Sequence, residues 1–333
     1  MTHRIRRRPA LVAAVLAALL ALTACGSSNN DAETEGSSGH DKVRLGQWIP
    51  GAPSLTALTS LMLAENQEIQ DEHDLTVEFT EYKNLQAMYT DLSTGRIDGL
   101  LGGPEAFAAS SNKGASAILA GSFSRSNAMI LSTGPELTAE NLRGKRMVAP
   151  TTTSTWQFVR LQIEDVTGLE AEKDYQLVTA ENSNASIQQL AAGTADFAMA
   201  WGEGLVEGLE KFPTITIVAD PEELAGGEEP FIQFAIAVNS DNLSPEVTDR
   251  LVKAYAAQAE WMRENPGEAD SRAQDFGRLE GTIEKMLTEP HLFIFDVKPF
   301  PGPEADELRA DLQLLVDTGH LSELPGPAFF NDH

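Results

Sequence analysis

Two segments that lie far apart in the chain carry the same pattern of residues. Residues 95–105 read GRIDGLLGGPE and residues 193–203 read GTADFAMAWGE. In each, a glycine suited to end a helix precedes an aspartate by three positions. An apolar strand and a glycine-containing turn then lead to a glutamate seven residues after that aspartate. This repeat predicts two α/β units built alike, one in each of two lobes, with Glu105 and Glu203 at matching positions.

Strands and helices alternate along most of the chain, separated by short loops rich in glycine and proline. The strand expected at 43–48 precedes a helix capped by Ser54, and the strand expected at 75–80 precedes a helix from Asn84 to Gly95. Such alternation indicates largely parallel sheets covered on both faces. With 333 residues, of which 42% are hydrophobic, the chain can form two ordinary cores.

The first 25 residues have the features of an export signal. Four arginines precede an apolar run over residues 9–22, which leads to Leu-Thr-Ala-Cys25. This tetrapeptide is similar to a bacterial lipobox, in which the cysteine becomes the lipidated first residue of the mature protein. Cys25 is the only cysteine, so no intrachain disulfide can form. We expect a lipoprotein signal peptide at 1–24 and a disordered, polar tether at 25–42.

The formal charge of −26, from 24 basic and 50 acidic residues, argues against a nucleic-acid partner. None of the six histidines is spaced as a metal ligand or paired with a nucleophile. We therefore expect no metal, no cofactor and no enzymatic activity. Glu105 and Glu203 keep open the alternative of a cleft enzyme that uses two carboxylates as acid and base.

A hydroxyl-rich segment links the strand expected at 145–149 to a helix. Pro150 ends the strand, and five consecutive Ser or Thr residues follow at 151–155, with Ser154 or Thr155 as the expected N-cap. A helix start presents free N–H groups and the positive end of the helix dipole, which suit an anionic or polar end of a ligand. The alternative is that these hydroxyls serve only as caps and turn formers.

Two parts of the chain resemble motifs of the substrate-binding proteins of ABC importers in the nitrate, sulfonate and taurine group, which includes carriers of the thiamine pyrimidine precursor. They are LRGKRMVAP at 142–150 with Ser154-Thr155, and GTAD at 193–196 with Trp201 and Glu203. The resemblance covers nearly all of the chain after the tether. Two departures stand out: Thr153 replaces a usual glycine, and Trp201-Gly202-Glu203 replaces Trp-Glu-Pro, which shifts the expected second-lobe contact by a residue.

The resemblance implies a periplasmic-binding-protein type II fold, with two α/β lobes, a hinge and an interlobe ligand cleft. We expect residues 43–131 plus 239–333 to form the first lobe and residues 132–238 the second. The resemblance also implies an exported monomer, held by a lipid such as palmitate on Cys25 at the outer face of the bacterial cytoplasmic membrane. Such a protein binds a small-molecule solute and delivers it to an ABC permease.

Ligands of open parallel sheets bind beyond the carboxyl ends of the strands. The loops expected there supply the candidate ligand-binding residues: Trp48, Pro50, Gly51, Tyr82, Lys83, Gly103, Glu105, Thr152, Thr153, Ser154, Thr155, Trp156, Asn182, Trp201 and Glu203. The three tryptophans suggest an aromatic-walled pocket. Lys83 and Arg125 are basic residues on these loops that can form an ion pair with an anionic group of the ligand. The two glutamates can accept hydrogen bonds from an amine or ring N–H, or act only as favourable helix-start residues.

The expected solute is a small polar organic compound, sulfonate- or taurine-like or a related nitrogen compound. A taurine-like zwitterion or an aminopyrimidine suits these residues better than nitrate does. Two other functions share the same sequence features. A cleft enzyme would be distinguished by a turnover assay, and a receptor that reports its ligand without import would be distinguished by the absence of neighbouring permease genes.

Overall fold

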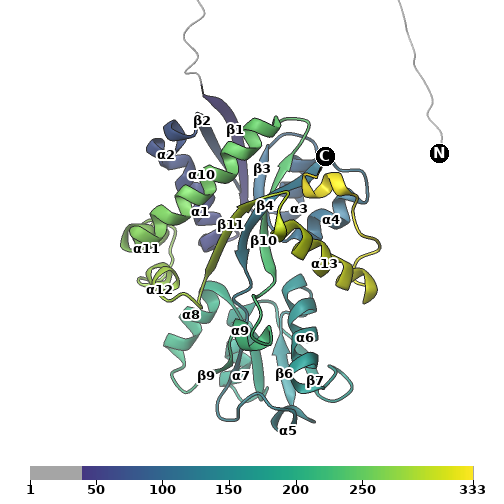
Figure 1. The fold of residues 1–333 in the computed structure, drawn as a ribbon. Coiled ribbons are helices and arrows are strands. Elements are labelled where there is room, and N and C mark those ends of the chain that lie inside the picture. The colour runs from purple at the N-terminus through teal and green to yellow at the C-terminus, as the bar shows by residue number, and fades with distance from the viewer. Residues whose placement is uncertain (1–39, 333) are drawn as a thin grey trace, which may run out of the picture. The chain divides into compact units, whose positions relative to one another are not determined.

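The computed structural model describes residues 40–332, which form two β-sheets with helices packed around them (Figure 1). The first sheet has the strand order β11-β4-β10-β3-β1-β2 and the second β7-β6-β8-β5-β9. The strands of the first sheet are β1 (Asp41–Trp48), β2 (Leu75–Tyr82), β3 (Gly99–Gly102), β4 (Ala117–Arg125), β10 (Ile232–Asn239) and β11 (Ile294–Pro299). Those of the second are β5 (Met129–Ser132), β6 (Arg146–Ala149), β7 (Gln176–Thr179), β8 (Phe197–Ala200) and β9 (Thr216–Ala219).

Each sheet combines parallel and antiparallel pairs. β1 runs parallel to β2 and β3, and β6 runs parallel to β7 and β8. β10 is antiparallel to β3 and β4, β11 to β4, and β5 to β8 and β9. The sheets are therefore mixed rather than largely parallel. β5 and β10, the first strands after each crossing, run against their neighbours, and the edge strand β11 also runs against β4.

The two crossings lie in residues 126–128, between β4 and β5, and in residues 220–231, between β9 and β10. Two strands therefore differ from the expected division into lobes: β5 belongs to the second sheet and β10 to the first. The tether expected to reach residue 42 ends earlier, because Asp41 and Lys42 pair with β2. The expected signal peptide at 1–24, Cys25 and the tether up to residue 39 lie outside the described residues.

Helices cover both sheets, and two of them begin at the capping residues expected from the sequence, Ser54 and Asn84. The first sheet is surrounded by α1 (Leu55–Glu65), α2 (Gln67–Glu72), α3 (Leu85–Ser93), α4 (Pro104–Ser111), α10 (Pro245–Glu264), α11 (Pro266–Gln274), α12 (Thr282–Thr288), α13 (Pro303–Asp317) and the 3-10 turn η1 (Pro327–Phe330). The second is surrounded by α5 (Ala139–Leu142), α6 (Ser154–Thr167), α7 (Ser183–Ala191), α8 (Gly202–Lys211) and α9 (Pro221–Leu224). Between residues 40 and 332, no helix has the length and apolar character needed to cross a membrane.

The repeated segments occupy equivalent places in the two lobes. Asn84 and Asn182 cap α3 and α7, each accepting the N–H of the residue three positions later. Gly95 and Gly193 follow these helices in the left-handed region, both with φ of 69°. Only glycine adopts that region without a steric penalty, so the two glycines turn the chain into the next strand.

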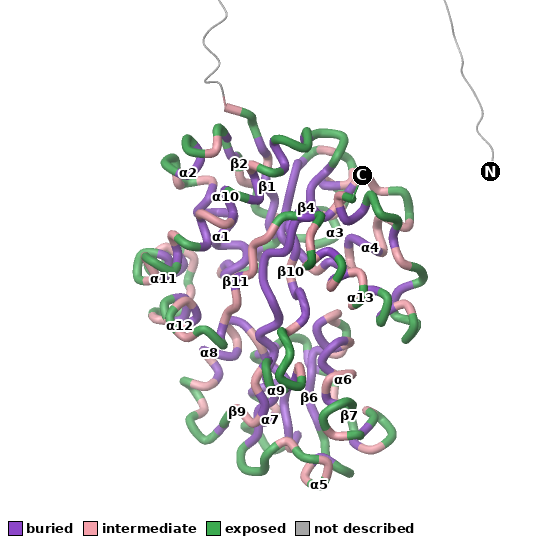
Figure 2. Tube along the Cα trace, viewed as in Figure 1, coloured by how far each residue is buried: buried purple, intermediate pink, exposed green. Residues whose placement is uncertain are grey.

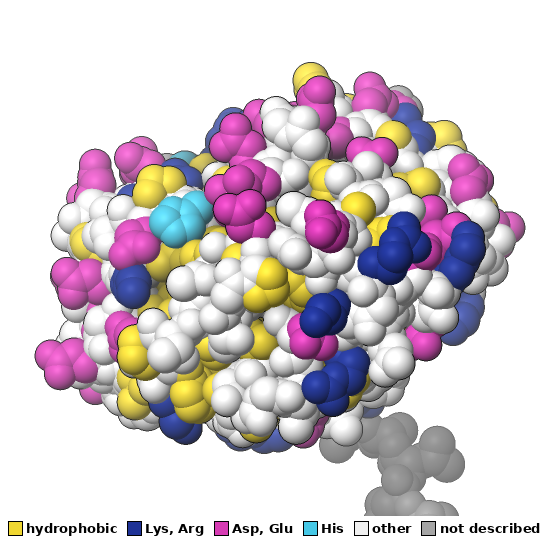
Figure 3. Space-filling model, turned by 90° about the horizontal axis from the view of Figure 1, so that it is seen from below, with side chains coloured by type: hydrophobic (Ala, Val, Ile, Leu, Met, Phe, Trp, Pro, Cys, Tyr) yellow, Lys and Arg dark blue, Asp and Glu magenta, His cyan; other side chains and the backbone are white. Residues whose placement is uncertain are grey.

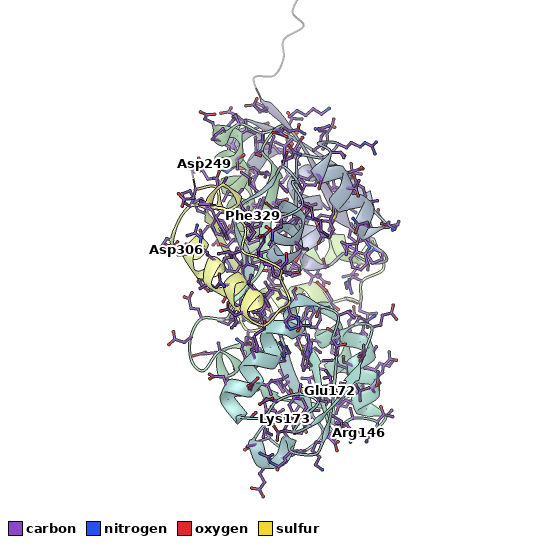
Figure 4. The ribbon with its side chains drawn as sticks, turned by 90° about the vertical axis from the view of Figure 1, so that its right-hand side faces the viewer. Arg146, Glu172, Lys173, Asp249, Asp306 and Phe329 are labelled. Atoms are coloured by element: carbon purple, nitrogen blue, oxygen red, sulfur yellow. The ribbon has the colours of Figure 1, made fainter. Side chains whose placement is uncertain are left out.

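The aspartates of the repeat also hold equivalent contacts. Asp98 accepts the backbone N–H of Arg44 on β1 at 2.8 Å, and Asp196 accepts that of Arg146 on β6 at 2.9 Å. Their surroundings differ, because the Asp98 side chain is 4% exposed and that of Asp196 is 33% exposed. Arg146 lies on the part of the second lobe that faces away from the first, where water reaches its side chain (Figure 4).

Buried residues concentrate in the strands and on the inner sides of the helices (Figure 2). An aromatic group joins three elements of the first lobe: Phe123 of β4 packs edge-to-face on Tyr255 of α10 at 6.0 Å and on Phe295 of β11 at 5.6 Å between ring centroids. Buried apolar area of this kind is the main source of stability.

The face of the second lobe seen from below carries several Lys and Arg side chains on one side (Figure 3). Arg143 and Lys173 are exposed in this lobe and pair with Asp174 and Glu170 at 2.7 and 2.5 Å. Exposed ion pairs of this kind add little to stability, since water and salt screen them.

Candidate ligand pocket between the lobes

A pocket of about 470 Å³ lies between the two lobes, where strand ends of both sheets meet. The first lobe contributes the end of β1, the starts of α1 and α4, and the first turns of α3. The second contributes the start of α6 and the residue that precedes α8, and β10 lines the pocket next to the second crossing. The connection order of the strands therefore brings together loops that are far apart in the sequence.

Eight of the fifteen predicted site residues line this pocket. They are Trp48, Gly103, Glu105, Thr152, Thr153, Ser154, Thr155 and Trp201. Trp48 lies at the end of β1 and is 43% exposed, and Trp201 caps α8, so both indole rings are available to a ligand.

The other predicted residues have different surroundings. Pro50 and Gly51 lie in an exposed turn after β1. Tyr82 donates its hydroxyl to Asp91, and Asn182 caps α7. Trp156 is only 2% exposed and packs in the core of the molecule, because the third residue of α6 faces inward rather than toward the pocket.

The two basic residues expected near the ligand are already paired. Lys83 donates to the Ile49 carbonyl oxygen at 2.9 Å and forms an ion pair with Glu81. Arg125 is buried, and Asp296, Glu307 and Glu229 surround its guanidinium at 2.5 to 2.8 Å. Neither side chain lines the pocket.

The hydroxyl groups at the start of α6 are largely satisfied by the protein itself. The N-cap is Thr153, not Ser154 or Thr155: its hydroxyl accepts the Trp156 N–H and donates to the Pro150 carbonyl oxygen. Thr155 accepts a hydrogen bond from the Gln233 amide at 3.2 Å. The hydroxyls thus form caps and also line the pocket, and their contact with a ligand stays a prediction.

Glu105 is the second residue of α4 and contacts the opposite lobe. Its carboxylate folds back over Gly103, where an added Cβ would meet Oε1 at 2.5 Å. Burial raises the pKa of Glu105 above its ordinary value, and hydrogen bonds from the Ser154 hydroxyl and from two backbone N–H groups oppose that rise only in part. The carboxyl group therefore lacks a neutralising cation in the pocket.

Glu203 is the second residue of α8 and makes the reciprocal contact. Its Oε1 accepts the backbone N–H of Leu55, the first residue of α1, at 2.5 Å. A carboxylate at a helix start is stabilised by the free N–H groups and by the helix dipole. The matching glutamates of the repeat thus cross the cleft in opposite directions, and each reaches the first turn of a helix in the other lobe.

Several pocket residues were not among the predicted ones. They are chiefly Gln47, Ser54, Thr56, Leu85, Met88, Tyr89, Gln233 and Phe234. Gln233 interrupts the apolar run of β10, which is a signal that the sequence does contain, whereas Gln47 lies in a strand that has other polar residues. Met88 and Tyr89 carry no such signal, because α3 has an ordinary amphipathic pattern. Among residues 40–332, no group of acidic, histidine or cysteine side chains is arranged to hold a metal ion.

The comparisons with known proteins agree with this architecture. The profile of the family described as "ABC transporter, phosphonate, periplasmic substrate-binding protein" matches residues 54–272, which is more than half of the chain. No curated protein matches the chain in sequence.

Solved structures with the same fold include several solute-binding proteins. The aliphatic sulphonate binding protein SsuA from Escherichia coli has a TM-score of 0.69 and 14% identity, covering 87% of this chain and 91% of its own. The alkanesulfonate-binding protein SsuA from Xanthomonas axonopodis pv. citri, bound to MOPS, has a TM-score of 0.63 and 17% identity, covering 88% and 99%. An ABC transporter from Parabacteroides distasonis has a TM-score of 0.67 and 18% identity, covering 88% and 98%.

The fold and the pocket define a two-lobed α/β solute-binding protein of the periplasmic-binding-protein type. The chain belongs to the family of phosphonate-type periplasmic substrate-binding proteins of ABC transporters. The family acts outside the cytoplasm, and this chain is accordingly an extracytoplasmic protein.

Proposed function

We propose that this protein captures a small polar organic solute in the pocket between its lobes and delivers it to the permease of an ABC importer. The observation that carries the proposal is the convergence of polar and aromatic side chains from both lobes on one pocket of about 470 Å³. This volume lies within the usual range for small-molecule sites. Membership of a transport family supports the delivery step.

The proposed solute is sulfonate- or taurine-like, or is a related nitrogen compound such as a thiamine pyrimidine precursor or another amine or heteroaromatic. Two similar structures are sulfonate-binding proteins, which supports the first group. Glu105 in the pocket supports the second, because a carboxylate accepts hydrogen bonds from amines and ring N–H groups.

A thermal-shift screen of the full-length protein tests this function. The screen contains sulfonates, taurine, nitrate, aminopyrimidines and small amines. A solute at 100 times its dissociation constant stabilises the folded state by about 2.7 kcal/mol, which is readily detected as a rise in Tm. If no compound of these classes raises the Tm, the proposed function is wrong.

Trp201→Ala should weaken binding of the solute found in the screen by roughly ten- to hundredfold, on the order of 1.5 to 3 kcal/mol, because an aromatic pocket wall is lost. Titration calorimetry measures the change. Trp261→Ala is the matched control: Trp261 lies on α10, outside this pocket, so its removal should leave affinity within about twofold. Equal losses in the two variants would contradict a binding role for Trp201.

We also propose that Cys25, outside the described residues, carries a lipid that anchors the protein to the membrane. Cys25→Ser should move the protein from the membrane to the soluble fraction, because acylation with more than one chain is what makes such anchoring stable. Ligand affinity should stay the same, since the polar segment after Cys25 separates the anchor from the folded part. Cell fractionation and titration of the released protein are the measurements. A variant that stays with membranes would rule out the anchor.

A further inference from the structure

We infer that the pocket is selective for organic cations, such as a primary amine or a protonated ring nitrogen held against Glu105, and that it discriminates against organic anions. This inference rests on the proposed function and specifies the solute class of the same site. It favours the nitrogen compounds over the sulfonates and the taurine-like zwitterions among the proposed solutes.

The charges around the pocket are the first support. Among the described residues that line it, Glu105 is the only one with a formally charged side chain, and no Lys or Arg is present. The nearest basic candidates from the sequence, Lys83 and Arg125, are held by carboxylates and carbonyl oxygens elsewhere. An anionic solute would therefore meet a carboxylate and no balancing cation, whereas a cationic solute would form a charge-assisted hydrogen bond.

The starts of α1 and α6 are the second support. An anion needs free N–H groups, and a helix start is the usual place to find them. In this protein the first N–H of α1 is held by Glu203 at 2.5 Å, and Ser154 at the start of α6 donates its hydroxyl to Glu105. The start of α1 is thus occupied by a carboxylate from the opposite lobe, and the start of α6 is capped by the Thr153 hydroxyl of its own lobe. At the start of α1, an anionic solute would have to displace a group of its own charge.

The aromatic walls are the third support. Trp48, Tyr89, Trp201 and Phe234 line the pocket together with Glu105. Aromatic faces attract organic cations through the ring quadrupole, and they repel anions placed over the same face. Burial disfavours the charged form of Glu105 and so raises its pKa. A cation bound beside the carboxylate would offset this cost.

Three probes that share one ring test the inference: benzylamine, phenylmethanesulfonate and benzyl alcohol. They differ chiefly in the group attached to the benzylic carbon, which is cationic, anionic or neutral at pH 7. Titration calorimetry of the full-length protein should show benzylamine binding at least about tenfold more tightly than phenylmethanesulfonate, because one charge-assisted hydrogen bond is gained and one repulsion avoided.

Glu105→Gln keeps the shape of the side chain and removes its charge. This variant should lose roughly ten- to hundredfold in affinity for benzylamine while its affinity for benzyl alcohol changes by less than about threefold, which shows that the pocket is intact. Glu172→Gln removes a charge from an exposed residue of the second lobe (Figure 4) and should bind benzylamine as the parent does. Glu203→Gln should bind phenylmethanesulfonate more tightly than the parent, because a neutral amide replaces the negative charge at the Leu55 N–H.

Two results would overturn the inference. One is a parent protein that binds phenylmethanesulfonate as tightly as benzylamine, or binds neither. The other is a Glu105→Gln variant with unchanged affinity for benzylamine. Binding of phenylmethanesulfonate as tight as that of benzylamine, if Trp201→Ala weakens it, would reject cation selectivity and leave the proposed transport function standing. Failure of every compound in the wider screen would reject the proposed function itself.

Discussion

Asp98→Ala should lower the free energy of unfolding by about 2 to 3 kcal/mol, because it removes a buried carboxylate and its hydrogen bonds, while the Arg44 side chain that is left behind is 37% exposed and stays solvated. The Arg44 guanidinium donates to the Asp98 carboxylate at 2.5 and 2.9 Å, and Asn242 donates to it at 2.8 Å. The carboxylate also accepts the Arg44 backbone N–H. One side chain therefore ties β1, the turn before β3 and the segment before α10 together.

Asp196→Ala is the matched control for this experiment. Asp196 has the same place in the repeat, but its carboxylate is 33% exposed and its ion pairs with Lys145 and Arg146 are 3.9 Å long. Its removal should lower the free energy of unfolding by about 1 kcal/mol, mainly because the hydrogen bond from the Arg146 backbone N–H is lost. Denaturant titration of both variants gives the comparison. Equal costs would show that burial does not decide the strength of these two contacts.

The effect of Asp98→Ala should also depend on pH. Burial acts to raise the pKa of Asp98, but the hydrogen bonds from Arg44 and Asn242 outweigh it and lower the pKa below its ordinary value. A carboxylate with a lowered pKa in the folded state stabilises that state above its unfolded pKa of about 3.9, and the contribution is lost as the pH falls through the folded value. The difference between parent and variant should therefore shrink below about pH 4.

Asp311→Asn should stabilise the protein at neutral pH. Burial, followed by the nearby Glu307 carboxylate, raises the pKa of Asp311 to about 7, and Arg125 opposes this rise only in part. Oδ2 of Asp311 is buried and has no hydrogen-bond partner among the described residues. Asp311 lines a surface hollow of about 710 Å³ between α6, α9 and α13, which Asp165, Glu228 and Glu229 also line. The negative charge is therefore unfavourable in the folded state.

The sign of the pH dependence follows from this raised pKa. Below about pH 4 the group is protonated in both the folded and the unfolded state and contributes nothing. Between about pH 4 and 7 only the unfolded state ionises, so the folded state loses about 1.4 kcal/mol per pH unit, or about 4 kcal/mol in all. The stability of Asp311→Asn relative to the parent should rise over this range and level off above pH 7.

Denaturant titrations at pH 4, 5.5, 7 and 8 measure this dependence. Asp165→Asn, at an exposed residue of the same hollow, should change stability by less than about 0.5 kcal/mol at each pH. If Asp311→Asn differs from the parent by the same amount at pH 4 and pH 8, the Asp311 carboxyl does not titrate with a raised pKa.

Local features of the structure follow closely from the sequence. The caps Asn84 and Asn182 begin α3 and α7, and Gly95 and Gly193 end the turns that follow them. These features depend on the dihedral preferences and side-chain hydrogen bonds of residues within about four positions, so a sequence pattern contains them. The repeat likewise predicts matching positions for Glu105 and Glu203, and each is the second residue of a helix. The alternation of strands and helices predicts the α/β class for the same reason, and the repeat predicts the two lobes.

Only the tertiary structure decided the directions of the strands, the sides on which side chains lie, and the contacts between distant segments. An apolar run does not show whether its strand enters a sheet parallel or antiparallel, so the sequence did not predict that β5 and β10 would run against their neighbours. The sequence also does not show which side of a helix start will face the pocket. Trp156 is an example, because its side chain faces the core. The Leu55 N–H and the Glu203 carboxylate are 148 positions apart, and the contact exists only because the two lobes bring α1 and α8 together across the cleft. Contacts at that separation depend on how whole sheets pack, and packing is a property of the folded chain that no local pattern encodes.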